Sequence, residues 1–188
     1  MKHVLFMVCL LWAGSGFGQG KYSTTQFDKL TEVKGSKFVI ASVNDWSKNI
    51  QTKDRYLLFI NTATGESNQM KFPLGSKINQ VEQVKIDELG INLILVEAQT
   101  VDLDGKTGID WNDPTQLIIL PTSGEGGTKL TEDSFFVRKW SVNETTGTIV
   151  VTGYSNNASK ENKYNRKSEQ NEIRIYDLKS LKLMHNIK

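Results

Sequence analysis

Leu93-Ile94-Leu95-Val96, an apolar run in the middle of the chain, has a counterpart on each side, and these repeats decide the architecture. Phe38-Val39-Ile40-Ala41 begins 55 residues before it, and Ile149-Val150-Val151-Thr152 begins 56 residues after it. Short runs rich in Val, Ile and Leu, bounded by Gly, Asn, Asp, Thr or Ser, are typical of β-strands. Their recurrence at a nearly fixed interval indicates a repeat architecture.

Two further series of strand-like runs accompany this one. One series follows it, at residues 57–61, 117–121 and 173–177. The other precedes it, at residues 84–88 and 140–144, and its members end in turns that contain Gly90 or Gly147. No window keeps the apolar period of an amphipathic helix. The sequence therefore predicts an all-β fold of three four-stranded antiparallel units, each with the strand content of one propeller blade. The units span residues of about 22–77, 78–134 and 135–188.

One stretch carries a resemblance to a known family. The glycine pair Gly126-Gly127 is followed by Leu130-Thr131 and then by Trp140-Ser141. This order of motifs resembles the WD40-like repeat of TolB-type β-propellers. Asn143-Glu144 stands where that repeat has a Pro-Asp-Gly turn. The resemblance implies three propeller-like blades that form a partial or half propeller, makes Trp140 part of a blade core, and points to an interaction platform.

A set of three blades raises the question of how the ring is closed. Propellers usually have about four to eight blades, and an incomplete ring leaves blade edges that must be covered. Three arrangements stay open: an open half propeller, a homodimer that closes a six-bladed ring, and a partner protein that covers the exposed edge. The stretch from Tyr22 to Val33 is expected to supply the inner strand of the first unit.

The N-terminal residues have the three-part layout of a secretory signal peptide. Its parts are a positive start at Lys2 and His3, an apolar run at residues 4–13, and small residues at Gly16 and Gly18 ahead of a cleavage site. The apolar run is roughly half as long as a membrane-spanning helix, and no second run of its kind follows. We therefore expect a signal peptide at 1–18 and a soluble domain at 19–188 that is periplasmic or secreted.

Composition and motifs exclude several classes of function. The 188 residues include 23 Lys and Arg against 21 Asp and Glu, a net charge of +2 that does not favour a nucleic-acid partner. Cys9 is the one cysteine and lies in the expected signal peptide, so disulfides and thiolate chemistry are excluded. His185 is the one histidine beyond that segment, which excludes histidine-rich metal sites. No P-loop, Gly-x-Gly-x-x-Gly or Gly-x-Ser-x-Gly motif occurs, so we expect no enzyme.

Carboxylates cluster in one loop. Asp102, Asp104, Asp110 and Asp113 lie in a segment that also contains glycine, and carboxylate oxygens are good ligands for calcium. The opening Asp-x-Asp-Gly matches the start of an EF-hand loop, but Lys106 stands where a further oxygen ligand is needed. A solvated loop that uses Asp and Gly as turn formers is the preferred interpretation, and calcium is the alternative.

Long polar loops follow the central strand of every unit, at residues 44–54, 102–113 and 155–171. Equivalent loops of successive blades emerge on one face of a propeller, where Trp46, Trp111 and Tyr164 would join the four aspartates in a recognition surface. A second interpretation of the two tryptophans stays open, in which both fold back and pack on their blades.

The function expected from these features is binding. We expect an exported, non-catalytic module that binds a protein of the cell envelope through the long loops or an open blade edge. A narrower version is an inhibitor or immunity protein that inserts a loop into the active site of an envelope-acting toxin. The alternative is a carbohydrate-active or calcium-dependent propeller enzyme, with Asp104, Asp110 or Asp113 near the axis of a closed ring. A purely structural component is the third class.

Overall fold

The computed structural model describes residue 27 and residues 29–42, 55–103, 105, 108–155 and 170–188. These residues form three four-stranded sheets in which every neighbouring pair of strands is antiparallel. The first sheet holds β1 (Lys29–Glu32), β2 (Phe38–Ser42), β3 (Arg55–Asn61) and β4 (Ser67–Phe72). The second holds β5 (Lys77–Ile86), β6 (Ile91–Gln99), β7 (Thr115–Pro121) and β8 (Thr128–Lys129). The third holds β9 (Phe135–Asn143), β10 (Thr148–Ser155), β11 (Gln170–Asp177) and β12 (Leu183–Ile187).

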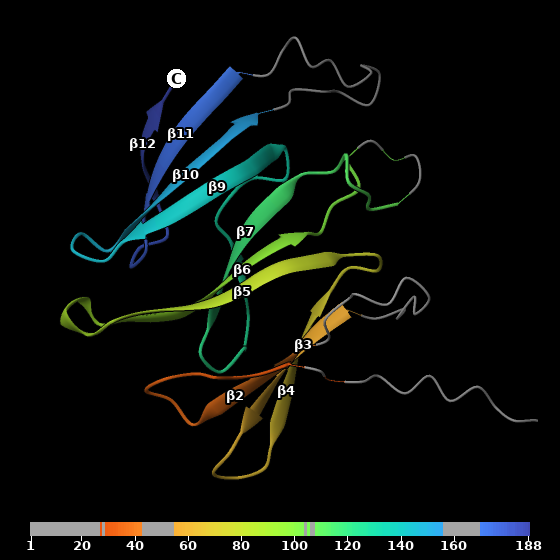
Figure 1. The fold of residues 1–188 in the computed structure, drawn as a ribbon, viewed down its shortest axis with the longest axis vertical. Helices are drawn as coiled ribbons and strands as arrows, with labels where there is room; N and C mark the ends of the chain where they lie inside the picture. The colour runs from red at the N-terminus through yellow and green to blue at the C-terminus, as the bar shows by residue number, and fades with distance from the viewer. Residues whose placement is uncertain (1–26, 28, 43–54, 104, 106–107, 156–169) are drawn as a thin grey trace, which may run out of the picture.

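The predicted all-β fold of three propeller-like blades is confirmed. The strands of each sheet follow one another in chain order, and the three sheets succeed one another along the long axis of the molecule (Figure 1). Within the described ranges the helical content is one short 3-10 turn, η2 (Asp87–Leu89). No helix in this part of the chain is long and apolar enough to cross a membrane.

The second sheet is buried on both faces. Successive side chains of a strand point to opposite sides of the sheet. Along β6, Leu93 and Leu95 pack with residues of the third sheet, whereas Ile94 and Val96 pack with residues of the first. β7 shows the same alternation. A strand that is apolar on both faces needs a layer on each side, which is why the middle run of the sequence decides the fold.

Two hydrophobic cores therefore join the three sheets. The first core lies between the first and second sheets and contains Val33, Ile40, Leu57, Phe59, Phe72, Ile94, Val96, Ala98, Ile118 and Leu120. The second core lies between the second and third sheets and contains Val84, Ile86, Ile91, Leu93, Leu95, Leu117, Ile119, Leu130, Phe135, Ile149, Val151, Tyr176 and Leu178. Burying one large apolar side chain contributes roughly 1.5–3 kcal/mol, so these cores are the main source of stability.

In each sheet, the turn between the first and second strands shows which residues of the three sheets are equivalent. These turns are closed by Val33 with Phe38, Ile86 with Ile91, and Asn143 with Thr148. Phe38, Ile91 and Thr148 are thus equivalent, because a turn sets the register of the strands that it joins. The apolar runs that were matched by sequence are displaced by one or two residues from this equivalence, since they were aligned by composition.

Trp140 differs from the expectation that it lies within a blade core. Its side chain is half-buried at the margin of the second core. The indole N–H donates a hydrogen bond to Glu97 Oε2 at 3.0 Å, from the third sheet to the second. The polar edge of the indole needs such a partner, so the residue sits where the core meets the surface.

Candidate functional site

Trp111 is the most exposed large apolar side chain among the described residues. It lies in the connection between β6 and β7, and 78% of it is exposed. Of the two interpretations left open by the sequence, the structure supports the exposed one for this tryptophan. Trp46, Tyr164 and Asp104 lie outside the described residues, so the wider recognition surface predicted from three loops stays a prediction.

The turn that presents Trp111 is held from beneath by Asp113. This carboxylate is buried and accepts the backbone N–H of Leu103 at 2.8 Å and that of Asp110 at 2.7 Å. Gln99, at the end of β6, donates its side-chain amide to the carbonyls of Asp110 and Asp113 at 3.0 and 2.8 Å. These hydrogen bonds hold the backbone on both sides of Trp111 against the second sheet. The exposed indole of Trp111 is therefore carried by a turn of defined conformation.

A second exposed apolar side chain comes from the neighbouring connection, between β4 and β5. Leu74 is 73% exposed. The two connections touch, because a Cβ atom built on Gly75 would lie 4.0 Å from Ile109 Cβ. We call Leu74, Ile109 and Trp111 the Trp111 surface. The strand ends that flank the long connections after β6 and β10 point toward the same side of the molecule, on the right in Figure 1.

The described aspartates of this loop are engaged by its own backbone. Besides the two bonds to Asp113, Asp102 Oδ1 accepts the N–H of Gly105 at 2.6 Å, and Asp110 Oδ1 accepts the N–H of Asn112 at 2.7 Å. These are the Asx-type contacts expected of a loop that uses Asp as a turn former. The part of the chain that the structure describes contains no group of three or more His, Cys, Asp or Glu residues that could hold a metal ion.

A buried polar network lies where the chain passes from the second sheet to the third. The Thr100 hydroxyl donates to Gln116 Oε1, and Gln116 Nε2 donates to Asp133 Oδ1 at 2.7 Å. The N–H of Leu117 donates to the Thr131 hydroxyl at 3.1 Å. Buried polar groups are costly unless they are paired, so this network fixes the path of residues 130–134.

Glu172 and Arg174 form a second buried polar cluster, on the face of β11 that is directed at the second core. Arg174 Nε donates to Glu172 Oε2 at 3.0 Å, and Asn186 Nδ2 donates to the same oxygen at 3.0 Å. The Ser155 hydroxyl donates to Glu172 Oε1 at 3.0 Å. Arg174 also pairs with Glu132, which lies in the connection between the sheets.

The environment of this cluster keeps both charges in place at neutral pH. Burial by itself raises the pKa of Glu172, but hydrogen bonds from Asn186, Arg174 and Ser155 outweigh it and leave the pKa below its ordinary value. Burial by itself lowers the pKa of Arg174, but its hydrogen-bonding partners and the nearby carboxylates raise it. Neither group exchanges a proton near pH 7, so the cluster stabilises the third sheet and offers no acid–base pair.

Sequence reasoning missed both polar networks. Their members come from segments up to 42 residues apart, as in the Arg174–Glu132 pair, and neither polar pattern nor spacing indicates such a contact. One local signal was available in β11, where Glu172 and Arg174 alternate with Ile173 and Ile175. The alternation was visible, but which face is buried depends on the partner strands.

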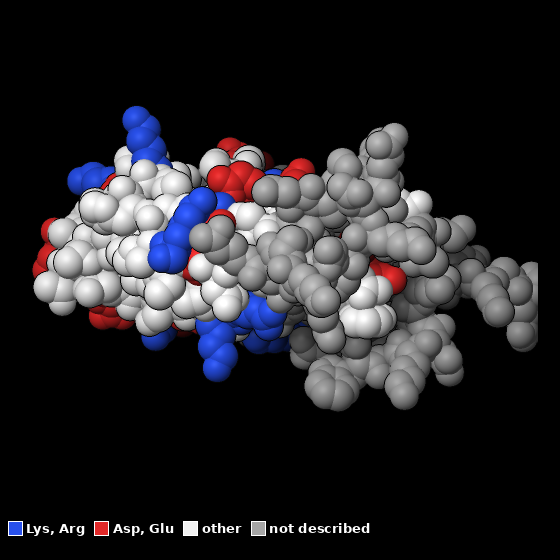
Figure 2. Space-filling model, turned by 90° about the horizontal axis from the view of Figure 1, so that it is seen from above, with Lys and Arg blue, Asp and Glu red and all other residues white. Residues whose placement is uncertain are grey.

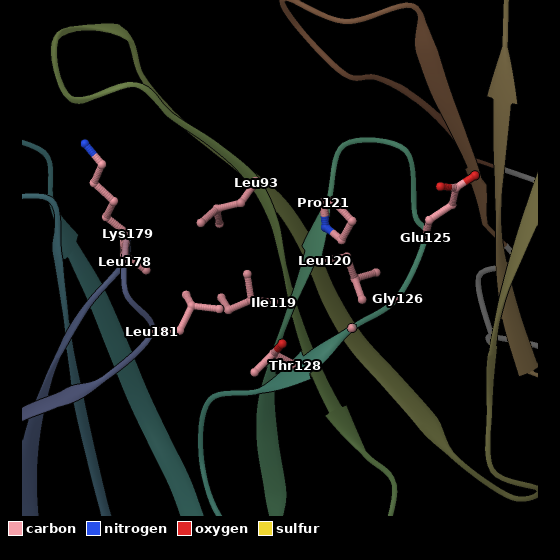
Figure 3. Close-up of a pocket in the computed structure, with 11 residues that line it drawn as sticks. Leu93, Ile119, Leu120, Pro121, Glu125, Gly126, Thr128, Leu178, Lys179 and Leu181 are labelled. Carbon is pink, nitrogen blue, oxygen red and sulfur yellow. The ribbon is translucent and has the colours of Figure 1, made fainter.

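A groove opens between the second and third sheets, at the ends of their strands that lie away from the Trp111 surface. It encloses about 510 Å³, and its lining includes the apolar residues Leu93, Ile119, Leu178 and Leu181 together with the polar residues Glu125, Thr128 and Lys179. In Figure 3 the side chains of Leu93, Ile119 and Leu181 point into the space between the sheets. These residues belong to the second core or pack against it, so the groove is the open margin of that core.

Comparison of this chain with protein-family models, with curated proteins and with solved structures found no match. Its function is therefore inferred from its own residues and contacts.

Proposed function

We propose that this chain is an exported, non-catalytic module that binds another protein of the cell envelope, and that the Trp111 surface makes the contact. The observation that carries the proposal is the exposure of Trp111, 78%, on a turn fixed by a buried carboxylate. Large aromatic side chains are the commonest energetic anchors of protein interfaces.

The way the turn is held supports binding over simple exposure. Asp113 and Gln99 fix the backbone on both sides of Trp111 before any partner arrives. Binding then costs less conformational entropy in this loop, because the ordering of interface loops is one of the costs of association. Leu74, in the connection that touches this loop, is exposed as well and adds apolar area to the Trp111 surface. The near-neutral charge of the chain, +2, fits a protein partner better than a polyanion.

Export is supported by the sequence of the first 18 residues, which has the layout of a signal peptide. The TolB-like repeat motif from Gly126 to Ser141 points in the same direction, because modules of that kind serve as interaction platforms. An inhibitor or immunity protein would insert the loop at 155–171 or the loop at 102–113 into a toxin, and the second of these contains Trp111.

The enzyme alternative has less support from the described residues. Asp113 was one of three aspartates assigned to a catalytic centre, and both of its carboxylate oxygens accept backbone N–H groups of its own loop. A carboxylate used in this way is not free to serve as a general acid or base.

The proposal is tested with the purified chain and a Trp111→Ala variant. The chain is coupled to a resin and used to capture proteins from the envelope fraction of its source cells. The captured protein is then purified and titrated against both forms by calorimetry. Replacing an interface anchor costs about 2 kcal/mol or more, so we expect Kd to rise at least about thirtyfold.

Leu183→Ala is the matched control, because Leu183 is also exposed, 44%, but lies on β12 away from the Trp111 surface. The control should bind as tightly as the unchanged chain. Equal binding by Trp111→Ala would refute the proposed surface, and so would an equal loss of binding by both variants, because the effect would then not be specific to Trp111.

A further inference from the structure

The two cores are built from opposite sheet faces used in a constant order. In the first sheet, Ile40 points toward the second sheet. Its equivalent in the second sheet is Leu93, which points toward the third sheet. We call this the forward face of each sheet. The other face, which carries Ile94 in the second sheet and Val151 in the third, points back toward the preceding sheet and is called the backward face.

This order leaves one face of each kind without a described sheet beside it, although the ring of Phe27 packs edge-on against Tyr56 on the backward face of the first sheet. The first sheet has no described sheet before it, so its backward face is open. The third sheet has no described sheet after it, so its forward face is open.

The backward face of the first sheet has an apolar middle, where Ala41 is already buried. Its edges are polar, with Glu32 on β1 and Ser67, Gln69 and Lys71 on β4. In its middle row, Leu30 pairs with Ala41 and Ala41 with Leu58 across β1, β2 and β3. In the next row, Val39 lies beside Ile60. Leu30 is 69% exposed, although leucine at such a position would normally be covered. Leu58 is equivalent to Leu120, which is fully buried in the first core.

The open forward face of the third sheet carries apolar side chains on β10, β11 and β12 and polar ones beside them, at Lys139, Ser141, Thr152 and His185. On it Val150 pairs with Ile175, and Ile173 pairs with Ile187. Ile173 and Ile187 are 39% and 54% exposed. Ile173 is equivalent to Leu57 and Ile119, which are core residues in the first and second sheets.

The side-chain pattern of β11 makes this face more than a chance exposure. Glu172 and Arg174 of the same strand are buried on the backward face, while the isoleucines between them point outward. A strand with a solvated outer face would show the reverse pattern. Seen from the side of the third sheet, most of the described surface is uncharged, with both basic and acidic side chains on it and at its margins (Figure 2).

We propose that the open forward face of the third sheet packs on the open backward face of the first sheet of a second copy of this chain. Two such contacts, related by a twofold axis, close a ring of six sheets. The occupant is a second copy because the chain itself carries both halves of the contact. Each internal core already joins a forward face to a backward face, so the new contact repeats a packing that this sequence makes twice.

Closure by two copies satisfies both faces at once. A head-to-tail contact either closes into a ring or grows into an open filament. Six sheets fall inside the range of about four to eight blades that propellers use, and three do not. The ring buries both apolar faces, whereas an open chain of copies always leaves one at each end.

The test is the mass of the purified chain in solution, measured by light scattering across a dilution series in the micromolar range. We expect twice the mass of one chain, which is 21.2 kDa before any processing. Leu30→Lys blocks the backward face, and Ile173→Lys blocks the forward face. Both sites are exposed, so the variants should fold, and circular dichroism with a thermal melt checks this.

Each single variant should be monomeric, because each removes one half of both contacts. An equimolar mixture of the two variants should regain a species of two chains, since one intact forward face still meets one intact backward face. Trp111→Ala is the control and should keep the mass of the unchanged chain, which separates this proposal from the proposed function.

A monomeric unchanged chain would overturn the proposal. So would a dimer that only one of the two variants disrupts, because that result means a like-with-like contact of a single face. Masses that grow with concentration beyond two chains would also overturn it, since they mean an open filament and not a ring.

Discussion

Leu181 occupies, in the turn between β11 and β12, the position that Gly65 occupies in the turn between β3 and β4. The two turns are closed in the same way, by the N–H of Asp177 to the carbonyl of Lys182 and by that of Asn61 to the carbonyl of Glu66. Gly65 has φ of 76°, and Leu181 has φ of 57°, the one non-glycine residue with positive φ among those described. Leucine is kept there because its side chain packs on the second core.

This relationship predicts an unusual order of stability at position 181. Leu181→Ala loses the packing and keeps the backbone strain, whereas Leu181→Gly loses the same packing and relieves the strain. We expect both to be less stable than the unchanged chain, with the glycine variant above the alanine variant by roughly 1 kcal/mol. Urea unfolding followed by circular dichroism measures the difference. An alanine variant more stable than the glycine variant would contradict this account.

Gly124, in the turn after β7, lies against the ring of Phe59 in the first sheet. A Cβ atom there would lie 2.2 Å from the Phe59 ring, and Phe59 is fully buried in the first core. Gly124→Ala should therefore destabilise the protein by about 3 kcal/mol or more, since neither the ring nor the turn has room to move.

Gly126→Ala separates this clash from backbone strain. Gly126 has φ of 76°, close to the 73° of Gly124, but nothing lies within 4 Å of its Cβ position. It should cost only the strain of about 1 kcal/mol. The melting temperatures of the two variants compare them directly, and similar values would mean that Phe59 does not confine Gly124.

The Glu172 cluster predicts a loss of stability in acid. Because the pKa of Glu172 is lower in the folded state than its ordinary value, the unfolded chain takes up this proton first as the pH falls. The stabilisation is complete above about pH 5 and disappears as the pH drops through the folded-state pKa.

Glu172→Gln removes the titration and the charge that faces Arg174. We expect it to lower stability at pH 7 by roughly 3 kcal/mol, as for other buried ion pairs that lose one partner, and to flatten the stability curve below pH 5. The urea midpoint measured from pH 3 to pH 7 gives both quantities. Glu144→Gln, an exposed carboxylate, is the control and should leave the curve unchanged. A curve of unchanged slope for Glu172→Gln would assign the acid sensitivity to other groups.

The repeats could be found in the sequence because the signal is local. A strand such as β6 carries its apolar residues in one short run. The turns that contain Gly90 and Gly147 mark where β6 and β10 begin. Register could not be found in the same way. Matching the apolar runs made Ile149 the equivalent of Phe38, whereas the turns make Thr148 the equivalent of Phe38. A shift of one residue matters because it exchanges the two faces of a strand.

The candidate site was predictable only in part for a related reason. The sequence marks residues 102–113 as a loop and Trp111 as its aromatic residue, but packing against or away from the sheet depends on hydrogen bonds made at a distance. Gln99 and Asp113 decide it, and they are 14 residues apart. The same holds for Trp140, whose half-buried place depends on Glu97, 43 residues earlier in the chain.

Asp113 links the stability of the second sheet to the Trp111 surface. Its carboxylate is the acceptor for two backbone N–H groups, at Leu103 and Asp110, in a position that is 3% exposed. Asp113→Ala leaves both donors buried without a partner, which costs roughly 1–3 kcal/mol for each group at most and less where water enters. We expect a loss of about 2 kcal/mol in the free energy of unfolding.

At temperatures where Asp113→Ala is fully folded, we expect its loss of binding free energy to exceed its loss of unfolding free energy. Without Asp113 the turn gains conformations, so Trp111 stays present but loses its fixed base, and the partner must order it on binding. Asp102→Ala is the matched control, because it removes one acceptor from the exposed part of the loop and leaves the bonds around Trp111 in place. Calorimetric titration should therefore show weaker binding for Asp113→Ala than for Asp102→Ala. Equal affinities would mean that Trp111 binds from a turn that needs no support, and the preorganisation argument would then fail while Trp111 itself could still be the anchor.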